Sequence, residues 1–75
     1  MLNQINTLKH LTISLCEPNG DSIISFDVND HISVIVPNVG DKVCVDGIFR
    51  VVTQKVFQYL PNMQTAVVEI TLKEN

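Results

Sequence analysis

The sequence PNVGDKVCVDGIFRVVTQKVFQY, residues 37–59, decides the fold class of this chain. Val43 and Val45 alternate with polar or small neighbours, which is the period of a strand that buries one face. Asp46 and Gly47 follow directly, and this dipeptide tolerates the positive φ angles that a tight hairpin turn requires. The stretch therefore predicts a short strand, a hairpin turn and a returning strand.

The returning strand, residues 48–58, is rich in β-branched and aromatic residues and contains no Gly or Pro, so we expect it to be the longest strand. Its apolar residues occupy both sides. One side carries Phe49, Val51 and Phe57, and the other carries Ile48, Val52 and Val56. A β-bulge within residues 53–55 would let this one strand serve two parts of a closed or strongly coiled sheet.

Four other segments alternate apolar and polar residues in the same way, and clusters of Pro, Asn, Gly and Asp separate several of them. These segments are residues 8–16, 22–28, 32–36 and 65–73. The side chains that they are expected to bury are Leu11, Ile13, Leu15, Ile24, Phe26, Val28, Ile32, Val34, Val36, Ala66, Val68, Ile70 and Leu72. Helical apolar spacing is not sustained over two turns in any segment.

The pattern predicts one all-β domain over residues 1–75, a small barrel of about five or six antiparallel strands. Residues 1–7 are polar apart from Leu2 and Ile5, and are expected to form a flexible arm or an extra edge strand. Chains of this size bury only roughly 60% of their unfolded surface, so a small aliphatic core must hold the fold together.

The segment PNVGDKVCVDGIFRVV, residues 37–52, resembles the loop and strand entry of SH3-like small β-barrels, and OB-like barrels share this architecture. The resemblance implies that Gly40 turns the backbone sharply and that Asp41 caps the turn. It also implies that Val43, Phe49 and Val51 belong to the core. Barrels of this kind are common in small bacterial and phage-encoded proteins, so the resemblance implies a phage or mobile-element origin and no specific activity. The role of an inhibitor or assembly factor would fit that origin.

The charge balance disfavours nucleic-acid binding. Five Lys and Arg residues face eight Asp and Glu residues, which gives a formal net charge of −3. Nucleic-acid binding takes most of its affinity from clustered basic groups, and the basic residues here are scattered along the chain. Nucleic-acid binding is therefore the least favoured function for this chain.

The two cysteines and the N-terminus indicate a cytoplasmic location. Cys16 and Cys44 would pair only in an oxidising compartment, and we expect them to be free buried thiols. The first residues lack the basic start and continuous apolar run of a secretory signal, and no stretch reaches the length of a membrane span.

Candidate metal and catalytic groups are sparse. His10, Cys16, His31 and Cys44 could together supply four zinc ligands, but they contain no closely spaced ligand pair, so no metal site is predicted. Residues 27–31 hold two oxygen donors of a calcium loop without its glycine or distal glutamate, and a polar turn explains them better. No cofactor and no enzymatic activity are predicted.

Apolar residues out of phase with the core are the feature that points to a function. A small barrel cannot bury both faces of its strands, and contiguous exposed apolar area marks an interface. An equally weighted alternative is that bulges bring several of these residues inside. The residues concerned are Ile23, Ile35, Ile48, Val52, Val56 and Val67.

We therefore expect a non-enzymatic protein-interaction or self-assembly module, either a homo-oligomer or one that docks on a protein partner. The alternative is a small-molecule or nucleotide binder whose pocket forms between protomers. Arg50 and Tyr59 are the first candidates for ligand contacts because they offer planar recognition groups, and Lys55 and His10 are further candidates.

Overall fold

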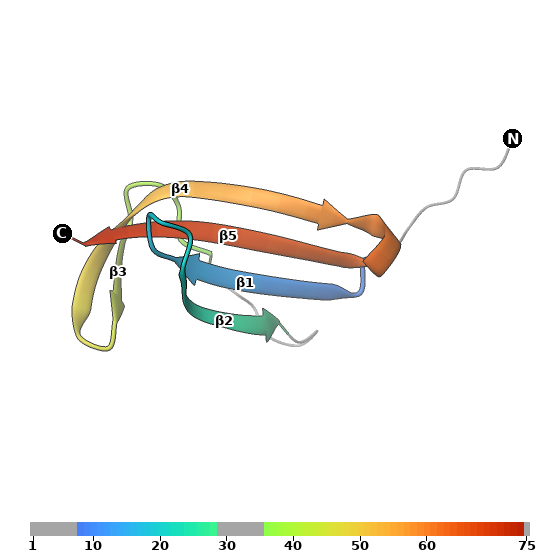
Figure 1. The fold of residues 1–75 in the computed structure, drawn as a ribbon, viewed down its shortest axis with the longest axis horizontal. Coiled ribbons are helices and arrows are strands. Elements are labelled where there is room, and N and C mark those ends of the chain that lie inside the picture. The colour runs from blue at the N-terminus through green and yellow to red at the C-terminus, as the bar shows by residue number, and fades with distance from the viewer. Residues whose placement is uncertain (1–7, 29–35, 75) are drawn as a thin grey trace, which may run out of the picture.

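The computed structural model describes residues 8–28 and 36–74. These residues form one five-stranded sheet in the order β2-β1-β5-β4-β3, which curls into a half-barrel (Figure 1). The strands are β1 (His10–Cys16), β2 (Ser22–Val28), β3 (Lys42–Val45), β4 (Ile48–Leu60) and β5 (Thr65–Glu74), and the 3-10 helix η1 (Pro61–Met63) joins β4 to β5. The predicted small all-β, barrel-like fold is confirmed.

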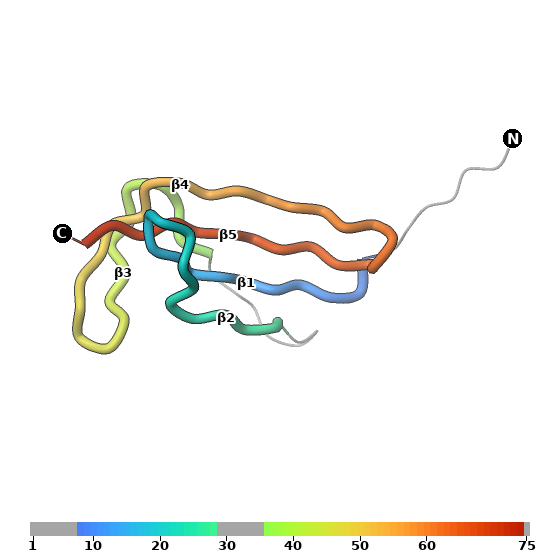
Figure 2. The backbone as a smooth tube through the Cα atoms, in the orientation of Figure 1, coloured from blue at the N-terminus to red at the C-terminus, as the bar shows by residue number. Residues whose placement is uncertain are grey.

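One strand pair corrects the expectation of a purely antiparallel sheet. β1 pairs with β2 in an antiparallel ladder, and β4 forms antiparallel ladders with β3 and with β5. β1, however, runs parallel to β5. The parallel ladder begins where the Gln64 carbonyl accepts hydrogen bonds from Lys9 N at 2.8 Å and His10 N at 3.1 Å. The tube in Figure 2 shows β1 and β5 starting side by side at the same end of the sheet.

The predicted turn chemistry is present. Asp46 and Gly47 have φ angles of 52° and 80°, as a tight hairpin between β3 and β4 requires. In the preceding loop Gly40 has a φ of 95°, and Asp41 Oδ2 caps the loop by accepting a 2.7 Å hydrogen bond from Asn38 N. The roles implied for Gly40 and Asp41 are thus confirmed.

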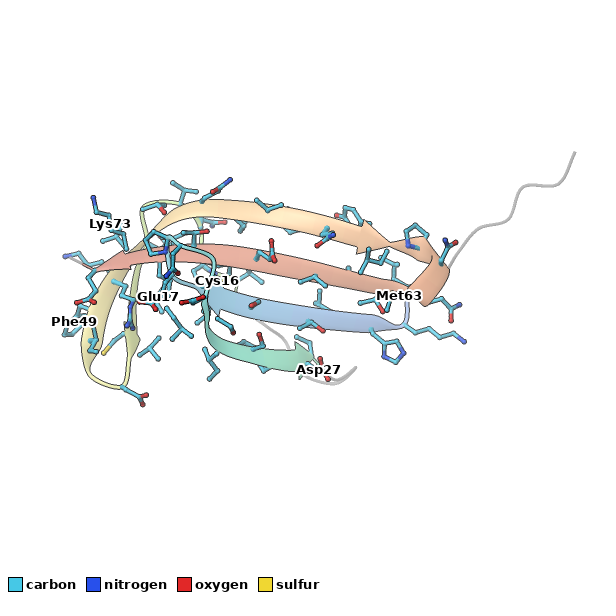
Figure 3. All side chains as sticks on the ribbon, viewed as in Figure 1. Cys16, Glu17, Asp27, Phe49, Met63 and Lys73 are labelled. Carbon is cyan, nitrogen blue, oxygen red and sulfur yellow. The ribbon has the colours of Figure 1, made fainter. Side chains whose placement is uncertain are left out.

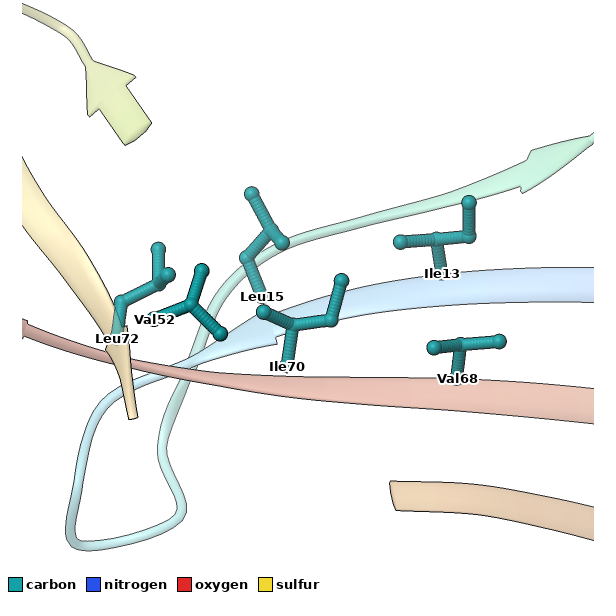
Figure 4. Close-up of a cluster of buried hydrophobic side chains, with 6 residues drawn as sticks. All are labelled: Ile13, Leu15, Val52, Val68, Ile70 and Leu72. Carbon is teal, nitrogen blue, oxygen red and sulfur yellow. The ribbon is translucent and has the colours of Figure 1, made fainter. Parts of the chain in front are cut away.

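The core lies on one face of the curled sheet, which we call the inner face. Its side chains project together from β1, β4 and β5 (Figure 4). Their almost complete burial confirms the alternation predicted for β1 and β5. The cluster consists of Ile13, Leu15, Val52, Val68, Ile70 and Leu72.

A β-bulge divides β4, as predicted. Val52 pairs with Leu72 and Gln54 pairs with Thr71, so Thr53 is the extra residue. Because one residue is inserted, even-numbered side chains face inward before the bulge and odd-numbered side chains face inward after it.

This change of phase corrects two predictions of core residues. Phe49 and Val51 precede the bulge and pair with Cys44 and Lys42 on the outer face of the sheet. Phe49 is 61% exposed and Val51 is half-buried. Val43 does pack against the core cluster, as expected.

Several predictions fall on residues outside the described part of the chain. They are the arm or edge strand of residues 1–7, most of the strand at residues 32–36, and the candidates His31 and Ile35. Val36 is described: it packs against the core cluster without belonging to a strand. Residues 8–28 and 36–74 contain no helix of the length and apolar character that crossing a membrane demands.

Two valines of β4 test the assignment of faces. Val52 is 1% exposed and Val56 is 39% exposed. Val52→Ala removes two methyl groups from a packed core and should lower the free energy of unfolding by about 2 kcal/mol. Val56→Ala is the matched control and should cost less than about 1 kcal/mol in the same urea titration. Equal costs would contradict the bulge at Thr53.

A second prediction concerns the loop before β3. A Cβ at Gly40 would meet no atom within 4 Å, so the cost of Gly40→Ala comes only from its positive φ. We expect a loss of about 1 kcal/mol in the free energy of unfolding. Gly40→Asn should cost less, because asparagine enters the left-handed region more readily than alanine. Thermal or urea unfolding would show this order, and an equal loss for both variants would refute it.

Candidate functional site

Three rows of side chains cross the inner face from β2 through β1 and β5 to β4. Their centres on β1 and β5 are buried or half-buried, whereas most of the side chains at their ends are partly exposed. In the middle row each end is a phenylalanine. The rows, read from the strand registers, are Ile24-Leu15-Ile70-Lys55, Phe26-Ile13-Val68-Phe57 and Val28-Leu11-Ala66-Tyr59.

The exposed ends of these rows on β4 lie beside an unpaired strand edge. β3 pairs only with β4 residues 48–51, so residues 54–60 pair with β5 on one side and with no described strand on the other. In Figure 1 this part of β4 forms the upper border of the sheet. We call residues 54–60 the open edge.

The direction of the backbone groups along the open edge follows from Val52. Val52 N donates to the Asp41 carbonyl and the Val52 carbonyl accepts from Gly40 N, both at 2.9 Å, so both groups of Val52 point away from β5. Beyond the bulge the Thr71 carbonyl faces β4, since it accepts a 3.4 Å hydrogen bond from Thr53 Oγ1. Gln54, opposite Thr71, therefore points its backbone groups toward β5.

Backbone groups alternate in direction from one residue of a strand to the next, which gives their directions along the rest of the open edge. The backbone N–H and C=O of Lys55, Phe57 and Tyr59 point away from β5, toward the side with no described strand. The side chains of the same three residues share the inner face. The open edge thus combines outward-pointing backbone groups with aromatic side chains that are 52% exposed at Phe57 and 61% exposed at Tyr59.

Lys55 joins the open edge to the loop before β3. Its Nζ donates to Asn38 Oδ1 at 2.5 Å and lies 5.4 Å from the centre of the Phe57 ring. The lysine head is therefore held over the aromatic ring, in a contact worth about 0.5–1 kcal/mol at an exposed site. This geometry orients both side chains on the same face.

The four residues predicted to contact a ligand do not meet within one protomer. Arg50 is 8% exposed and lies before the bulge, opposite Val43. Tyr59 lies near the other end of β4, and His10 is exposed on the outer face, opposite Thr65. Only Lys55 and Tyr59 share a surface. The predicted ligand pocket would need residues from two protomers, and it stays a prediction.

The residues predicted to form an interface divide between core and surface. Val52 belongs to the buried cluster and Ile23 packs against it, which corrects both assignments. Bulges route them inward: one lies at Thr53 and another at the end of β1, where Leu15 pairs with Ile24 and Cys16 with Ser22. The outer face carries Val56, which is exposed, and Val67, which is half-buried.

Sequence reasoning missed the inner-face position of Tyr59, because it placed the bulge without following its consequence. Once Thr53 is counted as an extra residue, Lys55, Phe57 and Tyr59 take the phase that Val52 had before it. The sequence places a bulge within residues 53–55 but does not show which residue is extra. That follows from the register of β4 against β5.

The remaining candidate groups do not gather around the open edge. Lys42 and Lys73 both pair with Val51 on the outer face, whereas Lys55 lies on the inner face beside Phe57. A hollow of about 540 Å³ lies at the other end of β4, lined by Lys42, Ile48, Phe49 and Glu74.

Cysteine and metal chemistry do not add to this site. Both thiols are free, and Cys44 is exposed, which corrects the expectation that it is buried. Within residues 8–28 and 36–74, no three His, Cys, Asp or Glu side chains are grouped as a metal ion would need.

Comparisons of the chain with protein-family models, with curated proteins and with solved structures gave no match.

Proposed function

We propose that this protein is a non-enzymatic interaction module that assembles with itself or docks on a larger protein. The observation that carries the proposal is the exposure of Phe57 and Tyr59 directly beside the open edge of β4. Exposed edge strands template the addition of another strand, and natural proteins usually blunt or cover them. Here Lys55 is a charged residue at the edge, its ammonium is held by Asn38 and the Phe57 ring, and the exposed aromatic groups of Phe57 and Tyr59 continue along the edge.

The composition of the open edge supports the same function. Apolar side chains occur on both of its faces, with Phe57 and Tyr59 inside and Val56 outside. Aromatic residues are the groups most enriched at the centres of protein interfaces, and they lose little conformational entropy when they bind. A partner that added to this edge would gain backbone hydrogen bonds and apolar contacts together.

The resemblance to small phage-encoded barrels extends the proposal to a biological role. The module would act in the cytoplasm as an inhibitor or assembly factor of a phage or mobile element. The net negative charge and the scattered basic residues make nucleic-acid binding less favoured than this role.

Two exposed phenylalanines of β4 offer a matched test. Phe57 borders the open edge, whereas Phe49 lies at the opposite end of β4 from η1 (Figure 3). Phe57→Lys should abolish assembly or partner binding, because it puts a charge into the proposed contact. Phe49→Lys should leave binding unchanged. Native mass spectrometry and sedimentation measure assembly, and circular dichroism confirms that both variants fold.

The comparison has a clear contrary outcome. If both variants are folded and bind as the wild type does, the open edge is not the interaction surface. If Phe49→Lys alone loses binding, the surface lies around the β3–β4 hairpin, and the proposal fails in its location.

A further inference from the structure

We infer that the occupant of the open edge is a second copy of this chain, paired antiparallel to the first through β4 of each. The inference rests on the proposed function and adds the partner and the register. The regular part of β4 between the bulge at Thr53 and η1 runs from Gln54 to Leu60, and its midpoint is Phe57. A two-fold axis at Phe57 pairs this stretch with itself over its full length.

Backbone geometry fits this register. Antiparallel partners exchange hydrogen bonds between residues whose N–H and C=O groups both point across the gap. With the axis at Phe57, Phe57 opposes its own copy and Lys55 opposes Tyr59 of the second copy. These are the three residues whose backbone groups point away from β5, so the pairing would form about six hydrogen bonds.

Side-chain chemistry also favours the register with its axis at Phe57 over the registers with the axis at a nearby residue. An axis at Lys55 would set two lysines against each other, and an axis at Gln58 would bring Pro61 opposite Lys55. An axis at Val56 would use the bulged Thr53 as a ladder residue. The axis at Phe57 avoids all three, stacks two phenylalanines and places each Lys55 ammonium beside a tyrosine ring.

The other strand edges fit a second copy less well. β3 spans only Lys42–Val45, which is short for a stable ladder. β2 carries the exposed carboxylate of Asp27, and charged side chains on an edge strand oppose the addition of another strand. The open edge of β4 is longer than β3, and the basic Lys55 is already satisfied there by Asn38 and Phe57.

The pairing of Lys55 with Tyr59 across the axis supplies the test. Within one copy these residues are four positions apart on a strand, or roughly 13 Å, so they do not touch each other. Tyr59→Lys would place two lysines in contact at both ends of the interface. The dissociation constant of the dimer should rise by roughly tenfold or more.

Charge reversal separates this contact from a general effect of losing tyrosine. Tyr59→Glu would face Lys55 of the second copy with a carboxylate, and the dimer should persist. The double variant Lys55→Glu with Tyr59→Lys should return the dissociation constant to within about threefold of the Tyr59→Glu value, because each lysine then meets a glutamate. Sedimentation equilibrium over a concentration series measures all three, with circular dichroism as the check on folding.

The outcomes distinguish the inference from the function that it deepens. Dimeric wild type with equal losses in Tyr59→Lys and Tyr59→Glu, or no rescue by the double variant, would overturn the register and leave self-assembly intact. Wild type that stays monomeric at high concentration would overturn the second copy as occupant. The proposed function would then depend on whether a foreign protein binds the wild type and loses binding to Phe57→Lys.

Discussion

The β-bulge at Thr53 is the constraint on which the rest of the structure depends. One inserted residue reverses the phase of β4, so that Val52 fills the core before the bulge and Phe57 and Tyr59 take the inner face after it. Without the insertion, a strand with apolar residues on both sides would have to expose one complete set. The bulge instead lets a single long strand contribute to the core at one end and to a surface at the other.

The bulge also marks the point beyond which β4 pairs with only one strand among the described residues. The loop before β3 closes on Val52 through two backbone hydrogen bonds, and Asn38 of the same loop holds Lys55 just beyond the bulge. β3 thus covers β4 only up to this point. The end of the pairing with β3 therefore coincides with the change of phase in β4.

Much of the fold could be predicted from the sequence because its signals are local. Alternation fixed the inward residues of β1 and β5, and Asp46 with Gly47 fixed the β3–β4 turn. The parallel pairing of β1 with β5 could not be predicted, because it joins residues far apart in the chain. The positions of Phe49 and Tyr59 depend on which residue of β4 is extra, and only the pairing with β5 identifies Thr53.

The exposure of the aromatic groups is related to the small size of the core and to the incomplete closure of the sheet. The six buried residues of the core are all aliphatic, and the half-barrel leaves β4 with an open edge where a closed barrel would place another strand. Closure within the chain would require a strand whose inner side chains complement Lys55, Phe57 and Tyr59. The same three residues in reverse order meet that requirement, because an antiparallel copy presents an aromatic ring to each lysine and a ring to the central ring. In the proposed dimer, a second protomer would therefore supply the strand that no described part of the chain places at the open edge.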